Sequence, residues 1–169
     1  FASSFDKKTK KIIVCRDGRL SSPELSESLK KGLFESGADV IDIGLGPSPM
    51  LYFAANYLES DGAIMVTGSH NPPNHNGFKI MKGKIPFFGK DILDIGARGN
   101  DGNWNYSEGS KSDYSIKDKY IGTLLKSLKI DKINPNIKVV WDPGNGAAGE
   151  IIEKLVKLLP GKHILINSN

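Results

Sequence analysis

The chain has 169 residues, a length that suffices for one well-buried domain or for one domain with part of a second. With 38% hydrophobic and 25% charged residues, its composition is that of an ordinary soluble globular protein. The sequence contains no apolar stretch approaching the roughly 20 residues that span a bilayer, so we expect no membrane partner. The segment from Phe1 to Lys8 lacks the positive-then-apolar order of a signal peptide.

The net charge of +4 raises the question of nucleic-acid binding. The basic residues are scattered along the chain, and aromatic residues do not alternate with them as a stacking platform requires. We therefore expect no nucleic-acid partner and interpret the lysines as a solvated surface that attracts anionic metabolites. The single cysteine, Cys15, permits neither an internal disulfide nor a thiolate metal cage, which favours a cytoplasmic location.

Strand and helix patterns alternate through the first part of the chain. In order, the predicted elements are a strand at Ile12–Cys15, a helix that starts near Ser21 and ends at Gly37, a strand at Val40–Ile43, a helix at Met50–Leu58, a strand at Gly62–Val66 and a strand at Phe78–Met81 that turns toward Ile85. Such an alternation predicts a three-layer α/β/α domain whose sheet is mixed but mainly parallel, with right-handed crossovers.

Periodicity fades between Gly96 and Ser112, and we predict a loop or flexible linker there. Beyond it, the predicted elements are a helix over 116–128, a strand at Ile137–Trp141, a helix at about 147–159 and a strand at His163–Ile166. These last three form the opening βαβ unit of a second, similar domain. We place the domains at residues 1–134 and 135–169. Because one βαβ unit cannot bury both faces of a sheet, we expect the chain to end inside the second domain.

The loop that follows the strand at Gly62–Val66 concentrates groups suited to an anion. Its sequence is T-G-S-H-N-P-P, and it leaves the carboxyl end of a buried strand, where open α/β sheets bind their ligands. Ser69 is the candidate nucleophile. Gly68 permits close backbone approach, and the amides from Gly68 to Asn71 could bind phosphate oxygens. We predict a phosphate site in this loop.

His70 and Lys79 could assist that serine. His70 either binds phosphate or substrate or only braces the loop with a hydrogen bond. Lys79, ten positions after Ser69, is either solvated or directed back at the serine loop, where it could supply charge or move a proton. A serine hydrolase fits poorly, because Asn71 replaces the last glycine of the G-x-S-x-G pattern.

Arg16 and Arg19 follow the first strand, and in a parallel sheet this end lies at the same edge as Ser69. Guanidinium groups there could hold the phosphate. Alternatively, Arg16 with Asp17 only braces the turn. Metal binding would need carboxylates, but no Asp-x-Asp-x-Asp pattern occurs in the chain.

Four stretches together resemble the α-D-phosphohexomutase family, in particular its bacterial phosphomannomutase/phosphoglucomutase branch. They are C-R-D-G-R-L-S-S-P-E-L (15–25), G-P-S-P-M-L-Y-F-A-A-N (46–56), G-A-I-M-V-T-G-S-H-N-P-P-N-H-N-G-F-K-I (62–80) and V-V-W-D-P-G-N-G-A-A-G (139–149). They follow the family's order and spacing, and the third is highly specific. Glycine before the serine resembles the hexose mutases more than the phosphoglucosamine mutases, which usually carry S-A-S-H-N-P.

The resemblance implies a magnesium-dependent phosphotransferase that converts hexose 6-phosphates to 1-phosphates, with mannose or glucose as the sugar and glucose 1,6-bisphosphate or its mannose equivalent as activator. It implies that Ser69 carries the transferable phosphate and holds the metal through it. It also assigns His70 and Lys79 to binding and proton transfer.

The chain departs from the family pattern in what it lacks: the Y-D-I-R-G segment, the D-G-D-G-D-R metal loop, and the sugar-selecting and phosphate-binding loops of the third and fourth domains. The resemblance covers the first domain and the start of the second. The chain is therefore expected to depend on the missing domains of its own polypeptide and to be inactive alone. The alternative from another class is a non-catalytic module that only binds phosphate.

Overall fold

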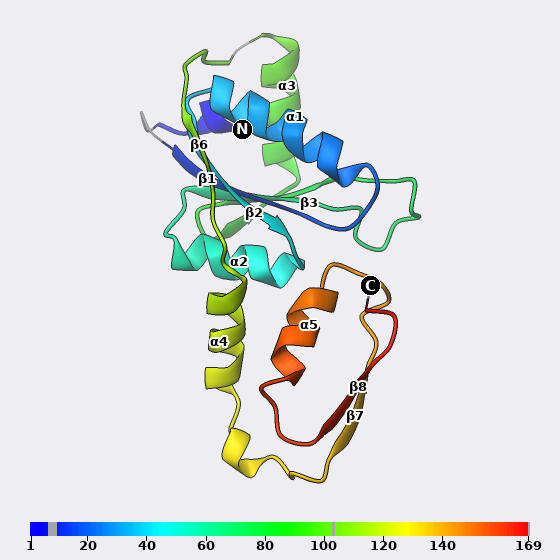
Figure 1. Ribbon diagram of the computed structural model, residues 1–169. Helices are drawn as coiled ribbons and strands as arrows, with labels where there is room; N and C mark the ends of the chain where they lie inside the picture. Colours follow the sequence, from blue (N-terminus) through cyan, green and yellow to red (C-terminus); the bar gives the residue numbers. More distant parts are fainter. Residues whose placement is uncertain (7–9, 103, 169) are drawn as a thin grey trace. The chain divides into compact units, whose positions relative to one another are not determined.

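The computed structural model describes residues 1–6, 10–102 and 104–168, so Lys7, Lys8 and Asn103, which enter the sequence arguments, lie outside the described residues. The chain divides into two compact units, Phe1–Tyr114 and Ser115–Asn169 (Figure 1). Within the described residues no helix is long and apolar enough to cross a membrane.

The first unit is built on a six-stranded sheet with the order β5-β4-β3-β1-β2-β6. Its strands are β1 (Lys10–Arg16), β2 (Ala38–Leu45), β3 (Gly62–Val66), β4 (Phe78–Lys82), β5 (Ile85–Phe87) and β6 (Ser110–Asp113). β1 pairs in parallel with β2 and β3, and β2 pairs in parallel with β6, whereas β4 runs antiparallel to β3 and β5 antiparallel to β4. The predicted mixed, mainly parallel sheet is confirmed.

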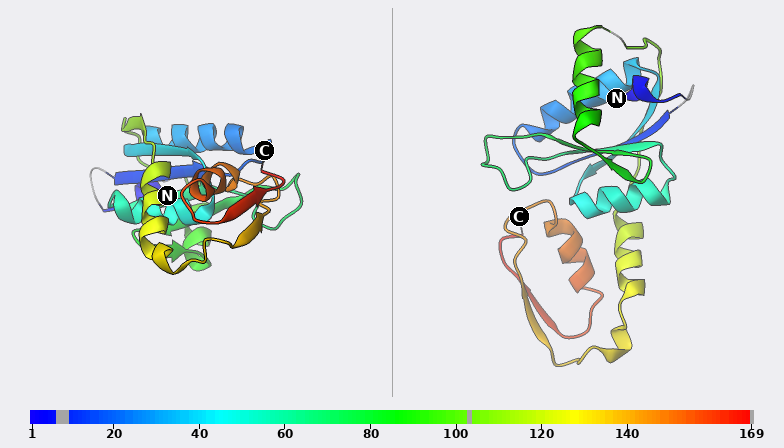
Figure 2. Two further views of the ribbon diagram at one scale, coloured as in Figure 1. Left: turned by 60° about the horizontal axis from the view of Figure 1, so that its bottom comes forward. Right: turned by 180° about the vertical axis from the view of Figure 1, so that it is seen from behind.

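Helices cover both faces of this sheet. They are α1 (Ser22–Glu35), α2 (Ser48–Tyr57) and α3 (Lys90–Asn100), preceded by a short 3-10 turn η1 (Ala2–Ser4). Figures 1 and 2 show α1 and α3 over one face and α2 over the other, which makes the three layers. α2 begins two residues before its predicted start, with Pro47 as N-cap and Pro49 inside its first turn, where proline's missing N–H is tolerated.

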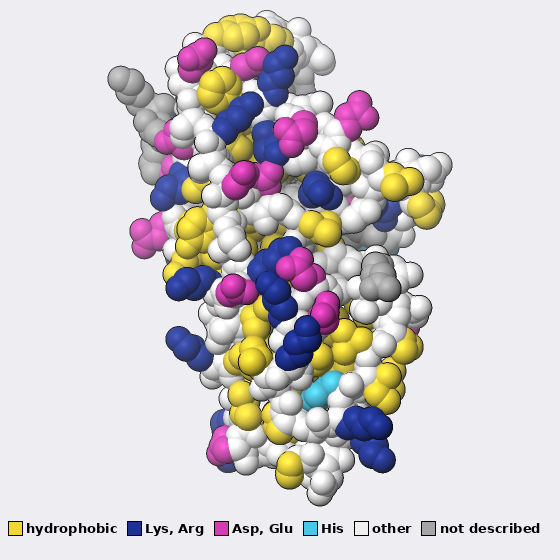
Figure 3. All heavy atoms as spheres, viewed as in Figure 1, with side chains coloured by type: hydrophobic (Ala, Val, Ile, Leu, Met, Phe, Trp, Pro, Cys, Tyr) yellow, Lys and Arg dark blue, Asp and Glu magenta, His cyan; other side chains and the backbone are white. Residues whose placement is uncertain are grey.

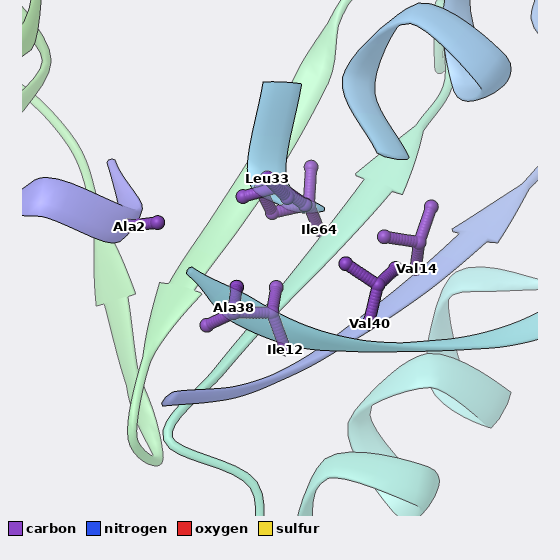
Figure 4. Packing of buried hydrophobic residues seen from close by; sticks show 7 residues of the cluster. All are labelled: Ala2, Ile12, Val14, Leu33, Ala38, Val40 and Ile64. Atoms are coloured by element: carbon purple, nitrogen blue, oxygen red, sulfur yellow. The ribbon is translucent and has the colours of Figure 1, made fainter. Parts of the chain in front are cut away.

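The core lies where β1, β2 and β3 meet α1. Its buried side chains are those of Ala2, Ile12, Val14, Leu33, Ala38, Val40 and Ile64 (Figure 4). Alternate residues of the same strands point to the other face, where α2 lies; Ile13 and Cys15 are both 0% exposed. Strands buried on both faces explain why β1 and β3 are continuous apolar runs in the sequence.

The prediction of a loop or linker over 96–112 is wrong at both ends. Gly96–Asn100 form the last turns of α3, and Ser110–Asp113 form the edge strand β6. The α3 signal is weak because the helix buries no residue and contains two glycines. The β6 residues S-K-S-D are all exposed and carry no hydrophobic alternation. This strand exists because Ser110 to Asp113 pair with Asp39 to Asp42 of β2.

The second unit contains a two-stranded parallel sheet and two α-helices. Its elements are α4 (Lys117–Ser127), the 3-10 turn η2 (Ile130–Lys132), β7 (Lys138–Trp141), α5 (Gly149–Val156) and β8 (Lys162–Leu165). The indole Nε1–H of Trp141 in β7 donates to Nδ1 of His163 in β8 at 3.0 Å. The order β7, α5, β8 confirms the predicted βαβ unit, although α5 is shorter at both ends than the helix predicted over about 147–159.

The compact units meet at residues 114 and 115, whereas the predicted domain boundary lies at 134. The difference is α4, which packs against α5 in the second unit. Ile121 and Ile151 are the buried residues with large apolar side chains in these two helices. A compact unit need not coincide with a family domain, so the assignment of residues 115–134 to the first domain stays a prediction.

Shortening Ile12 tests the location of the core. Ile12→Ala is expected to lower the free energy of unfolding by about 2–5 kcal/mol, because it leaves a cavity at a 0% exposed site. The matched control Ile85→Ala removes the same atoms from a side chain that is 70% exposed. It should change the free energy of unfolding by about 0.5 kcal/mol or less. Denaturant unfolding measures both, and equal losses would contradict the assignment.

Candidate functional site

The candidate site lies at the edge of the sheet where β1 and β3 end. Arg16 pairs with Val66 in the parallel register, and the Asp17 N–H donates to the Val66 carbonyl oxygen at 3.0 Å. The turn after β1 and the serine loop after β3 therefore begin side by side. This placement confirms the prediction that the residues after the two strands share one edge.

Ser69 is exposed at the tip of this loop, and two side chains reach its hydroxyl oxygen. Lys79 Nζ lies 3.1 Å from Ser69 Oγ, and His70 Nδ1 also lies 3.1 Å from this oxygen. β4 supplies the lysine because it returns antiparallel to β3, with Lys79 opposite Met65. The lysine ammonium donates to the hydroxyl, which can in turn donate to an unprotonated Nδ1. The structure thus brings Ser69, His70 and Lys79 together, as predicted.

No catalytic triad completes this group. Among the described residues, no carboxylate hydrogen bond to His70 accompanies its contact with Ser69. Without an acidic partner the imidazole lacks the group that orients it in serine hydrolases. The geometry fits a hydroxyl that is held next to positive charge better than one prepared for acyl transfer.

Ser69 has a backbone conformation that non-glycine residues rarely adopt. Its φ is 52°, in the left-handed region, which costs an L-residue about 1–2 kcal/mol. Its N–H donates to Thr67 Oγ1 at 2.9 Å, and the Asn71 N–H donates to the Gly68 carbonyl at 2.9 Å. These two amides serve the loop itself, so the predicted phosphate-binding nest of amides from Gly68 to Asn71 is not formed by them.

Arg19 takes a role different from the one predicted. Its guanidinium donates to four carbonyl oxygens of the serine loop, those of Pro72 at 2.6 Å, His75 at 2.9 Å, Ser69 at 3.0 Å and Asn71 at 2.8 Å. Nε faces Asp17 Oδ2 at 3.3 Å. A guanidinium has five N–H donors, of which the four on Nη1 and Nη2 are matched by four loop carbonyls, while Nε forms the ion pair with Asp17. The guanidinium therefore holds the serine loop in this geometry, and a phosphate contact of Arg19 stays a prediction.

Gly68 makes room for that guanidinium. A Cβ at this position would lie 2.4 Å from Arg19 Cζ and 2.6 Å from the His75 carbonyl oxygen. Gly68 thus permits a close approach of Arg19, and its predicted approach to a phosphate stays a prediction. Asn71, predicted to bind phosphate, contributes its main chain to the loop through the carbonyl that Arg19 holds. A phosphate contact of its exposed side chain stays a prediction, as does one of Arg16, whose Nη1 donates to the Asp17 carbonyl at 3.3 Å.

Asp17 anchors Arg19 and the turn after β1. Its Oδ1 accepts hydrogen bonds from the Arg19 N–H at 3.0 Å and from the Ser22 hydroxyl. Burial alone raises the pKa of the Asp17 carboxyl, but the hydrogen bonds from Ser22, Arg19 and Thr67 and the Arg19 charge together lower this pKa below its ordinary value. Asp17 is thus held as a carboxylate that balances the guanidinium.

Sequence reasoning did not identify Asn76 as part of this scaffold. Its Nδ2 donates to the hydroxyls of Ser21 and Ser22, each at 2.9 Å, and its Oδ1 accepts from the Gly77 N–H at 2.8 Å. The residue links the serine loop to the start of α1. The only sequence signal was its position before Gly77, which marks a turn and does not reveal a partner 54 residues away.

The described residues contain no cluster of side chains that could hold a metal ion by itself. No three His, Cys, Asp or Glu side chains within 1–6, 10–102 and 104–168 lie close enough to hold a metal ion. The exposed Ser69 hydroxyl beside Lys79 has a chemistry suited to a phosphate, and a phosphate there would present oxygens to a hard cation such as magnesium. The residues present therefore fit one oxygen ligand of such an ion.

The charge on the α1 face of the first unit is mixed. Figure 3 shows lysine and arginine side chains interspersed with aspartate and glutamate over this face. Lys30, for example, pairs with Asp42 and with Glu27. The alternation differs from the continuous basic surface that nucleic-acid backbones require.

Comparison with known proteins places this site in a described domain type. Residues 1–98 match the family model described as "Phosphoglucomutase/phosphomannomutase, alpha/beta/alpha domain I". A phosphomannomutase/phosphoglucomutase from Pseudomonas putida is 40% identical over 148 residues, covering 88% of this chain and 31% of that protein. A phosphoglucomutase from Neisseria gonorrhoeae is 36% identical over 158 residues, covering 92% of this chain and 34% of that protein.

A solved structure agrees with these relatives. The crystal structure of a phosphoglucomutase/phosphomannomutase family protein from Burkholderia thailandensis superimposes with a TM-score of 0.85 at 35% sequence identity. The match covers 95% of this chain and 36% of that one. The chain thus spans about a third of the length of the relatives it matches.

Adding one methyl group at position 68 tests whether the Arg19 guanidinium needs the space beside Gly68. Gly68→Ala is expected to cost about 1–3 kcal/mol of unfolding free energy, because the new Cβ overlaps Arg19 and the loop must shift. In the control Gly18→Ala, the Cβ has no heavy atom within 4 Å and should be tolerated. Thermal or denaturant unfolding of both variants measures the difference. If Gly68→Ala were as stable as the natural protein, the close packing of Arg19 against Gly68 would be refuted.

Acidification tests the Asp17 carboxylate. Because its folded-state pKa lies below the ordinary 3.8, its stabilisation is complete above that pH and is lost as pH falls through the folded-state value. Asp17→Asn should therefore be less stable than the natural protein at neutral pH, and the gap should shrink below about pH 3.8. Unfolding free energies measured across this range decide the matter; a gap independent of pH would show that the charge contributes nothing.

Proposed function

The chain belongs to the phosphoglucomutase/phosphomannomutase family, and we propose that it forms the phosphoserine part of an enzyme that interconverts hexose 6-phosphates and hexose 1-phosphates. The proposal covers mannose and glucose phosphates as substrates, because relatives carry the names phosphomannomutase and phosphoglucomutase. The observation that supports it most is the position of Ser69 Oγ, 3.1 Å from both Lys79 Nζ and His70 Nδ1.

The proposed reaction begins with a bisphosphorylated hexose, for which glucose 1,6-bisphosphate is the expected activator. Ser69 Oγ attacks one phosphorus atom, the bond from that phosphorus to the hexose oxygen breaks, and the hexose oxygen takes up a proton. The serine proton passes to His70 Nδ1. In the reverse transfer, phosphoserine gives its phosphoryl group to the free hydroxyl of a hexose monophosphate, which yields the bisphosphate and restores the serine. When Ser69 then takes the other phosphoryl group of that bisphosphate, the isomeric monophosphate is released and the phosphoserine is regenerated.

Lys79 contributes charge to this step. Its ammonium lies against the oxygen that bonds to phosphorus, where it offsets the negative charge of the phosphoryl group. Magnesium bound to the phosphoserine would neutralise further charge on the phosphoryl oxygens. Ser69 would carry the phosphate for such an ion, and the remaining ligands of the ion would belong to the rest of the proposed polypeptide.

A non-catalytic phosphate-binding module is the second candidate. The exposed lysine beside a serine hydroxyl would also bind a free anion without forming a bond to it. The two candidates differ in one respect, which is whether Ser69 becomes covalently phosphorylated.

Mass spectrometry of the full polypeptide, including the domains that this chain lacks, tests this difference. After incubation with glucose 1,6-bisphosphate and magnesium, we expect one added phosphoryl group on the peptide that contains Ser69. Ser69→Ala should abolish the addition, whereas Ser127→Ala, which removes an exposed helix hydroxyl in the second unit, should not. Reversible phosphate binding with an unmodified Ser69 would favour the binding module, and labelling of Ser69 by a fluorophosphonate would indicate a hydrolase instead.

A further inference from the structure

We propose that Arg19 is the positioning residue of the nucleophile: its guanidinium holds Ser69 in the left-handed backbone conformation that directs the hydroxyl at Lys79 and His70. The inference rests on the proposed function for its catalytic consequence. Its structural part stands on the contacts of Arg19, Ser69 and Gly68 alone.

The backbone of Ser69 is held on both sides of its two rotatable bonds. Its own N–H donates to Thr67 Oγ1 at 2.9 Å, and its own carbonyl oxygen accepts from Arg19 Nη2 at 3.0 Å. The first contact restrains rotation about φ and the second restrains rotation about ψ. An unfavourable φ of 52° persists only where the surroundings impose it. Thr67 and Arg19 are the two side chains that impose it here.

Arg19 restrains the rest of the loop in the same way. The same nitrogen that holds the Ser69 carbonyl also holds that of Asn71 at 2.8 Å, and Nη1 holds those of Pro72 and His75. The side chain is 16% exposed, and Asp17 meets its Nε at 3.3 Å. The planar group therefore acts as a template onto which four carbonyls of the loop are arranged, and it keeps no donor for substrate.

The direction of the Ser69 side chain follows from this template. Rotation of φ out of the left-handed region would swing Cβ, and Oγ with it, away from Lys79 Nζ and His70 Nδ1, each now 3.1 Å distant. Phosphoryl transfer depends on an oxygen placed in line with the leaving group, so such a rotation affects the chemical step more than the binding of the hexose.

Lysine cannot replace arginine in this role. An ammonium has three donors on one atom, whereas the guanidinium presents five from three nitrogens in a plane. Arg19→Lys therefore keeps the charge and the approximate length but loses the template. This variant separates positioning from charge, since a residue that only attracted phosphate would tolerate the exchange well.

The experiment uses the intact, dephosphorylated protein with glucose 1,6-bisphosphate and magnesium. We expect Arg19→Lys to slow single-turnover phosphorylation of Ser69 by about 100-fold, the loss that a misplacement of roughly 1 Å produces. The bisphosphate concentration that gives half the maximal rate should change by about threefold or less, because both Nη atoms of Arg19 already donate to loop carbonyls. The matched control Arg98→Lys, in α3, should behave as the natural protein.

A crystal structure of Arg19→Lys provides the second readout, and we expect φ of Ser69 to leave the left-handed region or its loop to lose order. If Arg19→Lys does not fold, Gly68→Ala replaces it, because its Cβ displaces the guanidinium while Arg19 remains. The inference would be overturned if the variant were phosphorylated as fast as the natural protein, or if φ of Ser69 stayed in the left-handed region in the variant. A large rise in the half-saturating concentration at a natural maximal rate would instead make Arg19 a phosphate ligand.

Failure of the proposed function would be visible separately. If the natural protein itself acquires no phosphate on Ser69, the mutase proposal fails. The φ of Ser69 in crystal structures of the natural protein and of Arg19→Lys still decides whether Arg19 positions this residue. A loss of thermal stability in Arg19→Lys without a slower phosphorylation would assign Arg19 a purely structural role and would also overturn the inference.

Discussion

The hydrogen bonds between one guanidinium and the main chain of one loop organise the candidate site. Arg19 extends from the turn after β1 and holds four carbonyl oxygens of the loop after β3. Hydrogen bonds within the loop, such as those from the Asn71 N–H to the Gly68 carbonyl and from the His75 N–H to the Pro72 carbonyl, leave other carbonyl oxygens of the loop to be bonded by donors elsewhere in the chain. The arginine supplies them from outside, and glycine at position 68 is what allows it to enter.

That arrangement depends in turn on the sheet. Parallel pairing of β1 with β3 places Arg16 beside Val66, so the two loops start from adjacent positions. The antiparallel return of β4 then brings Lys79 back to the level of the serine. Both strands that carry the loops are buried on two faces, and burial makes their register costly to shift. A rigid core thus determines the relative positions of groups that are themselves exposed.

Two kinds of positive charge meet at this edge, and they serve different purposes. Arg19 is largely buried, paired with Asp17 and saturated with carbonyl partners, so its charge is used within the fold. Lys79 is exposed, and its ammonium donates to the hydroxyl that would bear the phosphate in the proposed reaction. This division explains why two basic residues that look equivalent in a list of candidate phosphate ligands differ in what they can do for a substrate.

Much of this could be read from the sequence. The apolar runs of β1 and β3 and the helical spacing of α1 predicted the α/β architecture, because burial of a parallel sheet imposes continuous apolar strands. The T-G-S-H-N-P segment identified Ser69 and His70, since strand ends in such folds collect functional groups, and the N-G-F-K stretch that follows identified Lys79. The edge strand β6 escaped prediction because only pairing with β2 makes the polar residues Ser110 to Asp113 extended.

The roles of Arg19, Gly68 and Asn76 were decided by tertiary structure. Local sequence shows that Arg19 is cationic and that Gly68 lacks a side chain, but not that the two occupy the same space. Their partners are about 50 residues apart in the chain, and contacts over that distance depend on the register of strands rather than on local preference. The sequence by itself determined the chemical groups of the site and the sheet that carries them. Folding decided which groups face a ligand and which hold the loop in place, because that choice depends on how the donors of each side chain are already satisfied.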